Sequence, residues 1–558
     1  MGMFLDSIVP SERYKDIVRT RFFIDKSLMI AELISAVSID GQKYVCITRP
    51  RRFGKSVMAD MVAAFFGRTA DGAPIFEGLN ILSDRKEGRT DGDTSTPAQF
   101  GIDKEQVREC MNRYPVVYID FSEIPERCSC FDEYITRILE GLKEDLSSAY
   151  PEIVSDTSKA VWDIMTEIFQ KTRQRFVFVF DEWDAAFHMP FISEGDRQEF
   201  LRLLKALLKD KAYIEFAYMT GVLPIAKYSS GSEINMFKEY SMAASELYGE
   251  YFGFLEKEVD RLFEIYIQTT RIPKISRDDL RFWYDGYYTA VGERLYNPRS
   301  VVCALTDNQL KSYWTGSGPY EECYYYIKNN VKDIRDDLVL MVSGEGVKAR
   351  IQEYAATAAR LDTKDQIYSA MVVYGLLTYE DGSGRVFIPN KELMDRFDEL
   401  LLSKESLGYV YSLARQSEKM LAATLAGDTK TMAQILEFAH DTESPILSYN
   451  HETELSALVN LVYLSARDEY RVEREDKAGK GYVDFIFYPQ HRRGDALILE
   501  LKVDGKPEEA IRQIRDKRYV LRFQGKLGEK PKFEGRVLAV GISYDRRTKK
   551  HSCRVEEL

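Results

Sequence analysis

The N-terminal part of the chain alternates short apolar runs with segments whose apolar positions have helical spacing. Four runs, at residues 44–48, 115–121, 176–180 and 213–221, are short enough for β-strands. The third, Phe-Val-Phe-Val-Phe, has no polar position, which is typical of a strand in a parallel sheet buried on both faces. Residues 57–66 have the spacing of a helix. This alternation predicts an α/β domain, a parallel sheet with helices on both faces.

The C-terminal part follows a second pattern of helices and strands. An amphipathic helix is predicted over residues 451–468, with apolar positions at Leu455, Leu458, Val459, Val462 and Tyr463. Apolar runs then predict three strands, one helix and a last strand, at 470–473, 482–488, 496–503, 508–523 and 536–542. The order is αβββαβ, so we expect a second, separate α/β domain here.

Between these parts, residues 230–440 are predicted to be a largely helical lid and spacer. Near 364–400 a helix, a hairpin with Asp381-Gly382 at its tip and a further helix predict a winged-helix-like unit. Such units often bind DNA, but the acidic flanks of the hairpin favour a structural clasp against the N-terminal domain. We therefore expect three domains, at 1–229, 230–440 and 441–558.

Length and composition agree with a folded multidomain protein. A chain of 558 residues is too long for one hydrophobic core, and 45% hydrophobic with 30% charged residues is ordinary for globular domains. The N-terminus has no signal-peptide pattern, and no apolar run is long enough for a membrane helix, so we expect a cytoplasmic protein without membrane contact. The seven cysteines show neither a disulfide framework nor zinc spacing.

Charge is distributed unevenly along the chain. The net charge is −12, yet residues 451–558 hold 23 Lys and Arg against 19 Asp and Glu, and residues 501–550 hold 15 against 7. This basic segment has two interpretations that the sequence leaves open. It is either an electrostatic footprint for a polyanion or a solvated helix face.

A phosphate-binding loop is predicted between the strand at 44–48 and the helix at 57–66. Arg49-Pro-Arg-Arg-Phe-Gly-Lys-Ser56 ends in the Gly-Lys-Ser of such loops, in which Lys55 reaches the β and γ phosphates of ATP and Ser56 binds Mg²⁺. The first glycine of the usual pattern is replaced by Arg49, so the loop must turn without it. The predicted ATP-binding residues are Arg49, Pro50, Arg51, Arg52, Phe53, Gly54, Lys55, Ser56, Val57, Asp181 and Thr220.

An acidic strand end supplies the second half of this site. The strand at 176–180 is followed by Asp181 and Glu182, which we expect to hold Mg²⁺ and to polarise the attacking water. The alternative is a strand followed by an acidic helix cap. Thr220 ends the next strand, where a polar sensor would meet the γ-phosphate, or where an ordinary turn begins at Gly221.

A divalent-metal site is predicted in the C-terminal domain. Asp484 lies on one strand, while Glu500 and Lys502 share a face of the next because they are two positions apart. Two carboxylates suit Mg²⁺ or Mn²⁺, and a lysine beside them would orient a nucleophilic water. Glu452 on the preceding helix is a candidate third carboxylate, with Glu454 as the alternative.

Several motifs together resemble the AAA-ATPase-like proteins that end in a PD-(D/E)XK nuclease-superfamily domain. These motifs are RFFIDKS (21–27), TRPRRFGKS (48–56), FDEWD (180–184), MTGVLPIAK (219–227), WYDGYY (283–288), LYNPRS (295–300), GYVD (481–484), LELKV (499–503) and QIRDKRY (513–519). The resemblance implies a bacterial protein with a P-loop domain and a restriction-endonuclease-like domain. It also implies a role for Gln513 in the nuclease site and accounts for the absence of the first loop glycine.

Two functions remain open from the sequence. The first is an ATP-regulated nuclease that cleaves nucleic acid, in the first instance DNA. The second is a non-enzymatic ATP switch or scaffold whose nuclease-like end only binds nucleic acid. The set of Asp484, Glu500 and Lys502 favours the first. The oligomeric state is open, a homo-oligomer included, since no arginine finger stands out among the arginines.

Overall fold

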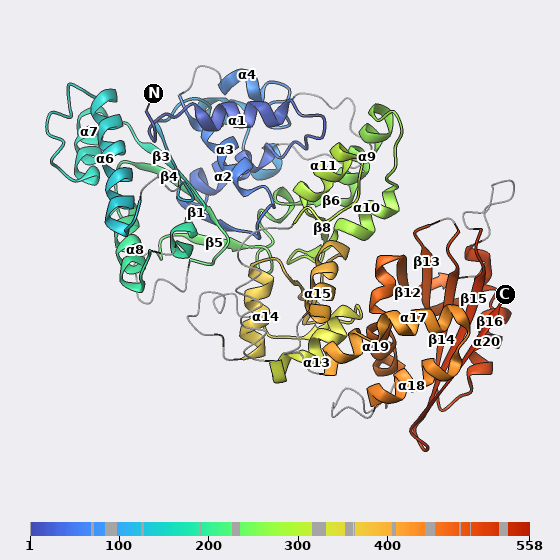
Figure 1. Cartoon of the computed structure of the whole chain (residues 1–558). Helices are drawn as coiled ribbons and strands as arrows, with labels where there is room; N and C mark the ends of the chain where they lie inside the picture. Colours follow the sequence, from blue (N-terminus) through green and yellow to red (C-terminus); the bar gives the residue numbers. More distant parts are fainter. Residues whose placement is uncertain are drawn as a thin grey trace. The chain divides into compact units, whose positions relative to one another are not determined.

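The computed structural model describes residues 2–68, 72–83, 97–123, 128–189, 191–225, 235–314, 331–351, 361, 363–403, 409–440, 452–478, 481–491, 493–523 and 534–558. The chain divides into two compact units, residues 1–320 with 349–392, and residues 321–348 with 393–558 (Figure 1). Residues 230–440, predicted as one region, are thus divided between the units. The predicted boundary at 229 lies outside the described residues. No helix in the described ranges is long and apolar enough to cross a membrane.

The first unit is built on a five-stranded parallel sheet. Its strands are β1 (Tyr44–Thr48), β2 (Val116–Asp120), β3 (Phe176–Asp181), β4 (Ile214–Gly221) and β5 (Lys238–Ser241). Their order is β2-β3-β4-β1-β5, and every neighbouring pair is parallel. The carboxyl ends of β1, β3 and β4 therefore meet at one edge, which brings the phosphate loop, Asp181 and Thr220 together.

Helices cover both faces of this sheet, as predicted. Val177 and Val179 belong to the core shared with α2 (Leu28–Ser38) and α3 (Lys55–Phe66). On the opposite face, Phe180 contacts Phe121 with ring centroids 5.4 Å apart, and Phe121 contacts Phe200 of α8 (Glu194–Leu208) at 5.1 Å. Because both faces are covered, a strand without any polar position is stable here.

A second, antiparallel sheet follows in the same unit. Its order is β6-β8-β7, with β6 (Phe254–Leu255), β7 (Asp285–Tyr288) and β8 (Arg294–Tyr296). The accompanying helices are α9 (Glu256–Thr269), α10 (Arg277–Tyr284) and α11 (Pro298–Asp307). Apolar side chains of these helices and strands, among them Leu262, Tyr284 and Val301, form a separate core.

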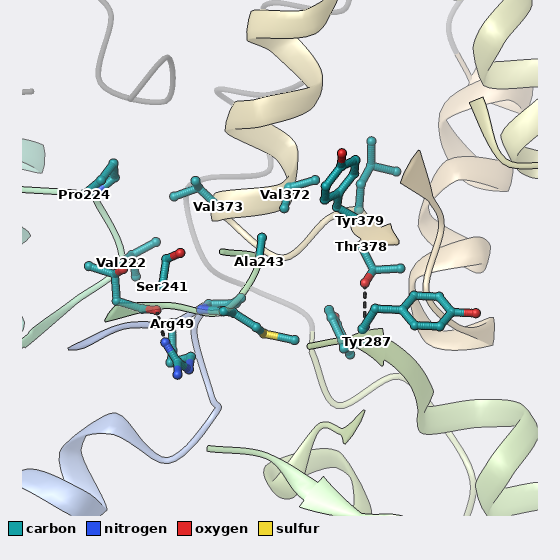
Figure 2. Close-up of a pocket in the computed structure, with 15 residues that line it drawn as sticks. Arg49, Val222, Pro224, Ser241, Ala243, Tyr287, Val372, Val373, Thr378 and Tyr379 are labelled. Atoms are coloured by element: carbon teal, nitrogen blue, oxygen red, sulfur yellow. Dashed lines mark hydrogen bonds between the residues drawn. The ribbon is translucent and has the colours of Figure 1, made fainter. Parts of the chain in front are cut away.

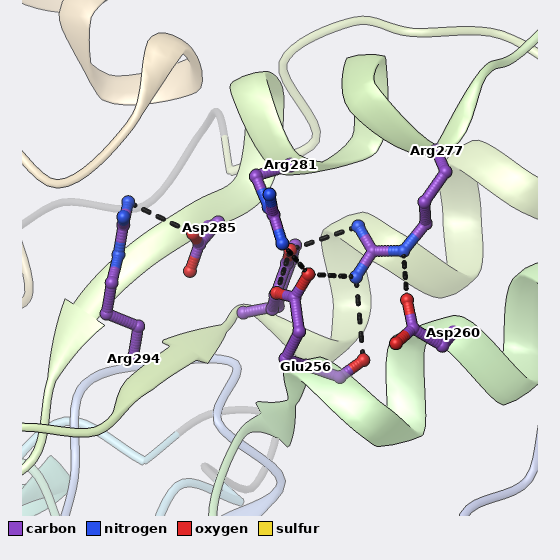
Figure 3. Close-up of polar contacts among 7 residues, drawn as sticks. Glu256, Asp260, Arg277, Arg281, Asp285 and Arg294 are labelled. Carbon is purple, nitrogen blue, oxygen red and sulfur yellow. Dashed lines mark hydrogen bonds and ion pairs between the residues drawn. The ribbon is translucent and has the colours of Figure 1, made fainter.

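Ion pairs hold the helices and strands of this region together (Figure 3). The Arg277 guanidinium lies between Asp260 at 2.7 Å and Glu256 at 2.8 Å. The hydroxyl of Tyr296 donates to the Glu256 carboxylate at 2.6 Å, which ties β8 to the start of α9. Arg294 pairs with the buried Asp285 at 3.0 Å. These contacts fix β8, and hence the start of α11 that follows it.

The predicted helix, hairpin and helix are present as α14 (Lys364–Val373), β10 (Thr378–Glu380), β11 (Arg385–Phe387) and α15 (Lys391–Ser403). The backbone N–H of Tyr288 on β7 donates to the Thr378 hydroxyl at 2.7 Å. A cavity of about 30 Å³, room for about one water, separates α14 and β10 from the edge of the main sheet (Figure 2). The helix and the hairpin thus lie beside β7 and the main sheet of the same unit.

The second unit contains the five-stranded sheet β12-β13-β14-β15-β16. Its strands are β12 (Tyr470–Ala478), β13 (Gly481–Pro489), β14 (Ala496–Val503), β15 (Val537–Asp545) and β16 (Lys550–Glu557). Only the β14/β15 pair is parallel. With α19 (Glu452–Val462) before the sheet and α20 (Pro507–Asp516) between β14 and β15, the order is the predicted αβββαβ. The edge strand β16 was not predicted.

The remaining helices, strand and 3-10 turns complete the described ranges. They are α1 (Val9–Val18), α4 (Gly72–Phe76), α5 (Lys104–Cys110), α6 (Phe131–Ala149), α7 (Val161–Thr172), α13 (Val331–Val342), α16 (Tyr409–Ala414), α17 (Ser417–Ala426), α18 (Thr429–His440), β9 (Val347–Lys348), η1 (Pro97–Phe100), η2 (Ala185–His188), η3 (Gly249–Tyr251), η7 (Leu464–Asp468) and η8 (Tyr519–Arg522).

Candidate functional site

A cavity of about 700 Å³ opens over the loop between β1 and α3. Its lining includes every residue from Arg51 to Met58, together with Glu182. Gly54 precedes α3 with φ 87°, a conformation that glycine adopts without strain. The first N–H groups of a helix have no partner within it and attract anions, so the start of α3 is suited to phosphate.

Lys55 and Asp181 are buried charged residues of the predicted ATP site. The Lys55 ammonium is 4% exposed and donates to the Pro50 carbonyl at 3.2 Å. Burial lowers the pKa of Lys55, although the carboxylates of Glu182, Asp184 and Asp181 oppose that shift. An ammonium held by one neutral carbonyl is ready to exchange it for a phosphate oxygen.

The Asp181 carboxylate lies at the end of β3 and is 1% exposed. Its Oδ1 accepts from the Thr220 hydroxyl at 3.0 Å and from the Glu182 N–H at 3.1 Å. Burial, with the charges of Asp120 and Glu182, raises the pKa of Asp181 to about 6, while Ser56 and Lys55 oppose the rise. Within the described residues Oδ2 receives no hydrogen bond, which fits a site for a cation.

Glu182 stands between two cavities. Besides the large one, it lines a cavity of about 240 Å³ together with Arg51, Ser122, His188 and Tyr374. Its backbone has φ 47°, an unusual value for a residue other than glycine, and this conformation directs the residue out of the strand line. Its neighbour Asp184 has a different task, because its carboxylate accepts from the Val222 and Leu223 N–H groups and holds the end of β4.

Arg49 is turned away from the large cavity. Its guanidinium is 1% exposed and donates to the carbonyls of Thr48 at 2.8 Å, Tyr240 at 2.7 Å and Tyr248 at 3.3 Å. It also lies over the Phe252 ring at 5.0 Å. Arg49 thus fastens β5 and the segment after it to the loop. Of the predicted ATP-binding residues, Arg49, Pro50, Asp181 and Thr220 do not line the cavity, although they adjoin it.

The far end of the cavity is lined by residues to which the sequence assigned no role. Phe22, Phe23 and Ile24 of the RFFIDKS motif lie there, as do Pro298 and Arg299 of the LYNPRS motif. The two phenylalanines, Ile24 and Pro298 offer an apolar surface of the kind that holds a base, and Arg299 adds a positive charge beside it. Both motifs belong to those that carry the family resemblance, and this was the signal that could have identified these residues as part of the site.

Two further residues of these motifs are structural. Lys26 is 7% exposed, and its ammonium donates to the Glu258 carboxylate at 2.6 Å and to the Glu250 carbonyl at 2.6 Å. Asn297 caps α11, accepting from the Ser300 N–H at 3.2 Å, and so fixes where Pro298 and Arg299 enter the cavity.

In the second unit, four predicted residues lie together. Asp484 of β13 accepts from the Leu501 N–H of β14 at 2.7 Å. The Glu500 carboxylate of β14 accepts at Oε1 from the Lys502 ammonium at 3.1 Å and from the side-chain amide of Gln513 on α20. Sequence spacing predicted the shared face of Glu500 and Lys502, the predicted metal site included Asp484, and the motif resemblance implied Gln513; the fold brings all four into contact distance of one another's strands and helix.

Glu500 has the electrostatics of a cation ligand. It is 3% exposed, and its Oε2 has no hydrogen-bond partner in the described part of the chain. Burial and the charge of Asp484 raise the pKa of Glu500 to about 7, against the opposing charges of Lys502 and Lys517. Two neighbouring carboxylates repel each other unless a cation or a proton lies between them. These residues therefore fit a divalent cation.

The predicted third carboxylate is not settled by the structure. Glu452 is the first residue of α19, and its side chain lies outside the described part. Glu454 lies on the same helix. Among the described residues, no group of three or more His, Cys, Asp or Glu side chains is arranged to hold a metal ion. The described side chains thus supply two carboxylates, and water or phosphate oxygens would complete the coordination of a hard cation.

Fold and site together define a P-loop ATPase domain joined to a nuclease-like domain. Residues 11–230 match the family model described as predicted AAA-ATPase, and residues 454–549 match the PD-(D/E)XK nuclease superfamily. The chain thus combines a domain of the predicted AAA-ATPase family with a domain of the PD-(D/E)XK nuclease superfamily. This confirms the resemblance inferred from the motifs.

The individual proteins that the chain resembles have low sequence identity to it. An uncharacterized protein in the vnfD 5′ region of Azotobacter chroococcum is 26% identical over 306 residues, 53% of this chain and 51% of that protein. The chain thus spans about half the length of the curated relative it matches. Among solved structures, a Walker-type ATPase of Pyrococcus abyssi has a TM-score of 0.34 at 10% identity, covering 66% of this chain and 94% of its own. The ORC2 protein of Aeropyrum pernix has a TM-score of 0.32 at 10% identity, covering 69% and 98%.

Proposed function

We propose that the first unit binds ATP with Mg²⁺ in the 700 Å³ cavity and hydrolyses it. In this proposal the phosphates lie at the start of α3, and the Lys55 ammonium leaves the Pro50 carbonyl for the β and γ phosphates. Ser56 and Asp181 hold Mg²⁺, which neutralises phosphate charge. Glu182 orients and polarises the attacking water, and Thr220 keeps Asp181 in place through its hydrogen bond.

We further propose that the second unit hydrolyses phosphodiester bonds of DNA with Mg²⁺ or Mn²⁺. Asp484 and Glu500 would hold the ion, which lowers the pKa of water and offsets phosphate charge. Lys502 would orient the nucleophilic water, and Gln513 would fix the Glu500 carboxylate. The observation that carries this proposal is the buried Glu500 carboxylate, whose unpartnered oxygen lies beside Asp484 and Lys502.

The basic turn, which we define as Arg546, Arg547, Thr548, Lys549 and Lys550, supports DNA as the substrate. Parallel pairing sets Lys502 of β14 opposite Ser543 of β15. The basic turn therefore follows β15 at the same end of the strands as Lys502. The Arg546 guanidinium donates to the Asp504 carboxylate at 2.6 Å. Arg547, Lys549 and Lys550 are exposed, and none has an ion pair among the described residues. They would contact phosphates on either side of the cleaved bond.

Metal binding tests the nuclease proposal before any cleavage assay. We expect Mn²⁺, titrated into the full chain with the ATP site blocked by Lys55→Ala, to bind once per chain. Adding Asp484→Ala or Glu500→Ala to that chain should each remove binding. Adding Glu508→Ala, on the exposed first turn of α20, is the matched control and should keep it. Retained binding after Glu500→Ala would show that the ion site lies elsewhere.

The second candidate is an ATP switch whose C-terminal domain only binds nucleic acid. It draws support from the pair of described carboxylates where three would make a stronger site. Under this alternative, DNA binds the second unit without Mn²⁺ binding and without cleavage. The metal titration therefore separates the two functions.

A further inference from the structure

A buried carboxylate, Glu392, gathers three segments of the first unit. It is 1% exposed and lies in the first turn of α15. Its Oε2 accepts from the Ser300 hydroxyl of α11 at 2.8 Å. Its Oε1 accepts from the backbone N–H of Trp314 at 2.6 Å and from that of Tyr313. A buried carboxylate so fully engaged holds its neighbours in fixed positions.

Two of these segments lead directly to the nucleotide cavity. Arg52, in the phosphate loop, lines the cavity and donates to the Tyr313 carbonyl. Ser300 follows Arg299, which also lines the cavity. The positive charges of Arg52 and the negative charge of Glu392 influence each other, since Arg52 opposes the rise in the pKa of Glu392 that burial causes. A single peptide unit, the one between Tyr313 and Trp314, therefore joins Glu392 to a loop arginine: its N–H donates to Glu392 and its carbonyl accepts from Arg52.

A second chain of contacts joins the same loop to the segment that follows α14. The Phe53 ring packs edge-on against Tyr287 with centroids 4.8 Å apart. The Tyr287 hydroxyl donates to the Gly375 carbonyl at 3.0 Å. Gly286, with φ 131°, lies so close to the Pro389 carbonyl that a Cβ would stand 1.8 Å from its oxygen. The backbone just before α15 is thus held against β7, and it leaves little freedom to the start of the helix.

Glu392 also marks the end of the first unit. The unit closes at residue 392, while α15 continues to Ser403 in the second unit. A continuous helix transmits a displacement at its first turn along its length, because each turn is hydrogen-bonded to the next.

We propose that Glu392 is a positioning residue that couples occupancy of the nucleotide cavity to helix α15. This rests on the proposed ATP site. Phosphates in the loop draw the Arg52 guanidinium away from the Tyr313 carbonyl, because an anionic oxygen is the stronger acceptor. The peptide unit between Tyr313 and Trp314 then keeps its contact with Glu392 but loses the one with Arg52, so the hold of this segment on the first turn of α15 loosens. Helix α15 opens more often when nucleotide is bound.

Hydrogen exchange in the full chain tests this coupling at saturating concentrations of a non-hydrolysable ATP analogue. In the unaltered protein we expect the α15 amides from 395 to 403 to exchange at least about threefold faster with the analogue than without it. Glu392→Gln, which keeps an acceptor oxygen for Tyr313 and Trp314, should bind the analogue but lose that difference. Ser300→Ala, which removes only one hydrogen bond, should reduce it.

The matched control is Glu399→Gln on the same helix, where the side chain is 64% exposed and pairs with Arg396 at 2.6 Å. It should respond like the unaltered protein. A nucleotide-dependent difference that survives in Glu392→Gln overturns the coupling, as does its absence in an unaltered protein that binds the analogue. If the unaltered protein does not bind the analogue, the ATP proposal itself fails, and calorimetry distinguishes that outcome.

Discussion

Replacing Arg49 by glycine restores the usual first residue of a phosphate loop, and we expect it to destabilise this protein. The Arg49 guanidinium is buried and donates to the carbonyls of Thr48, Tyr240 and Tyr248. Arg49→Gly leaves these carbonyls buried without their charged donor and removes the contact with Phe252. Glycine also enlarges the conformational freedom of the unfolded chain, which acts in the same direction.

The magnitude follows from these contacts. Each hydrogen bond from a charged donor contributes about 1.5–3 kcal/mol, and a buried cation over an aromatic ring about 2 kcal/mol. Such contributions are not additive, and the third hydrogen bond is long at 3.3 Å. We therefore expect a loss of about 3–5 kcal/mol in the free energy of unfolding of the first unit, the range found when one partner of a buried charged network is removed.

Urea unfolding followed by tryptophan fluorescence measures this loss. All four tryptophans, at 162, 183, 283 and 314, lie in the first unit, so the signal reports on that unit. With about 3 kcal/mol per molar urea, the midpoint should fall by at least about 1 M. Arg49→Lys keeps the charge but not the planar guanidinium, so its urea midpoint should lie between those of the unaltered protein and Arg49→Gly. An unchanged midpoint for Arg49→Gly would refute the anchoring role and restore a nucleotide contact for Arg49.

Three other predictions concern the loop, a buried carboxyl and the basic turn. Lys55→Ala should abolish nucleotide binding, whereas Glu182→Gln should bind ATP and lose turnover; unchanged hydrolysis would mean that another residue polarises the water. Burial raises the pKa of Asp60 to about 7 from 3.8, so the folded state holds the proton more tightly, and this carboxyl should contribute a loss of about 1.4 kcal/mol per pH unit to the stability of the first unit as pH rises between these values. Asp60→Asn should make the slope shallower by about that amount, and an unchanged slope contradicts the assignment. Replacing Arg547 and Lys549 by alanine should weaken DNA binding and make the slope of log affinity against log salt shallower by about 2; an unchanged slope would exclude the basic turn from phosphate contact.

The sheets and the loop-to-strand motifs were predictable because strong local patterns specify them. The run at 176–180 contains only apolar residues and has the length of a strand, which predicts a buried strand. Gly-Lys-Ser between a strand and a helix is typical of a phosphate-binding loop. Likewise, two-residue spacing sufficed to place Glu500 and Lys502 on one face. These features depend on residues close in sequence.

Features that depend on distant residues were not predictable. The anchoring of Arg49 needs carbonyls at 240 and 248, and the engagement of Glu392 needs residues 300, 313 and 314. The edge strand β16 reads as a charged segment, because only one side of it pairs and its exposed positions are polar. Likewise, no spacing in the sequence connects Gln513 to Glu500, because Gln513 lies on α20 and Glu500 on β14, and only the packing of this helix against the sheet brings the two side chains together.

Cleavage of supercoiled plasmid by the full chain, with Mg²⁺ or Mn²⁺ and with or without ATP, tests the central claim most directly. We expect the unaltered protein to cleave, and Asp484→Ala, Glu500→Ala and Lys502→Ala each to remove cleavage while ATP binding is retained. Because these residues act as one unit, the Asp484→Ala, Glu500→Ala double variant should be scarcely worse than either single variant. Cleavage that continues at the unaltered rate in Glu500→Ala, or an unaltered protein that binds ATP and DNA with metal present and leaves the plasmid intact, would contradict the account.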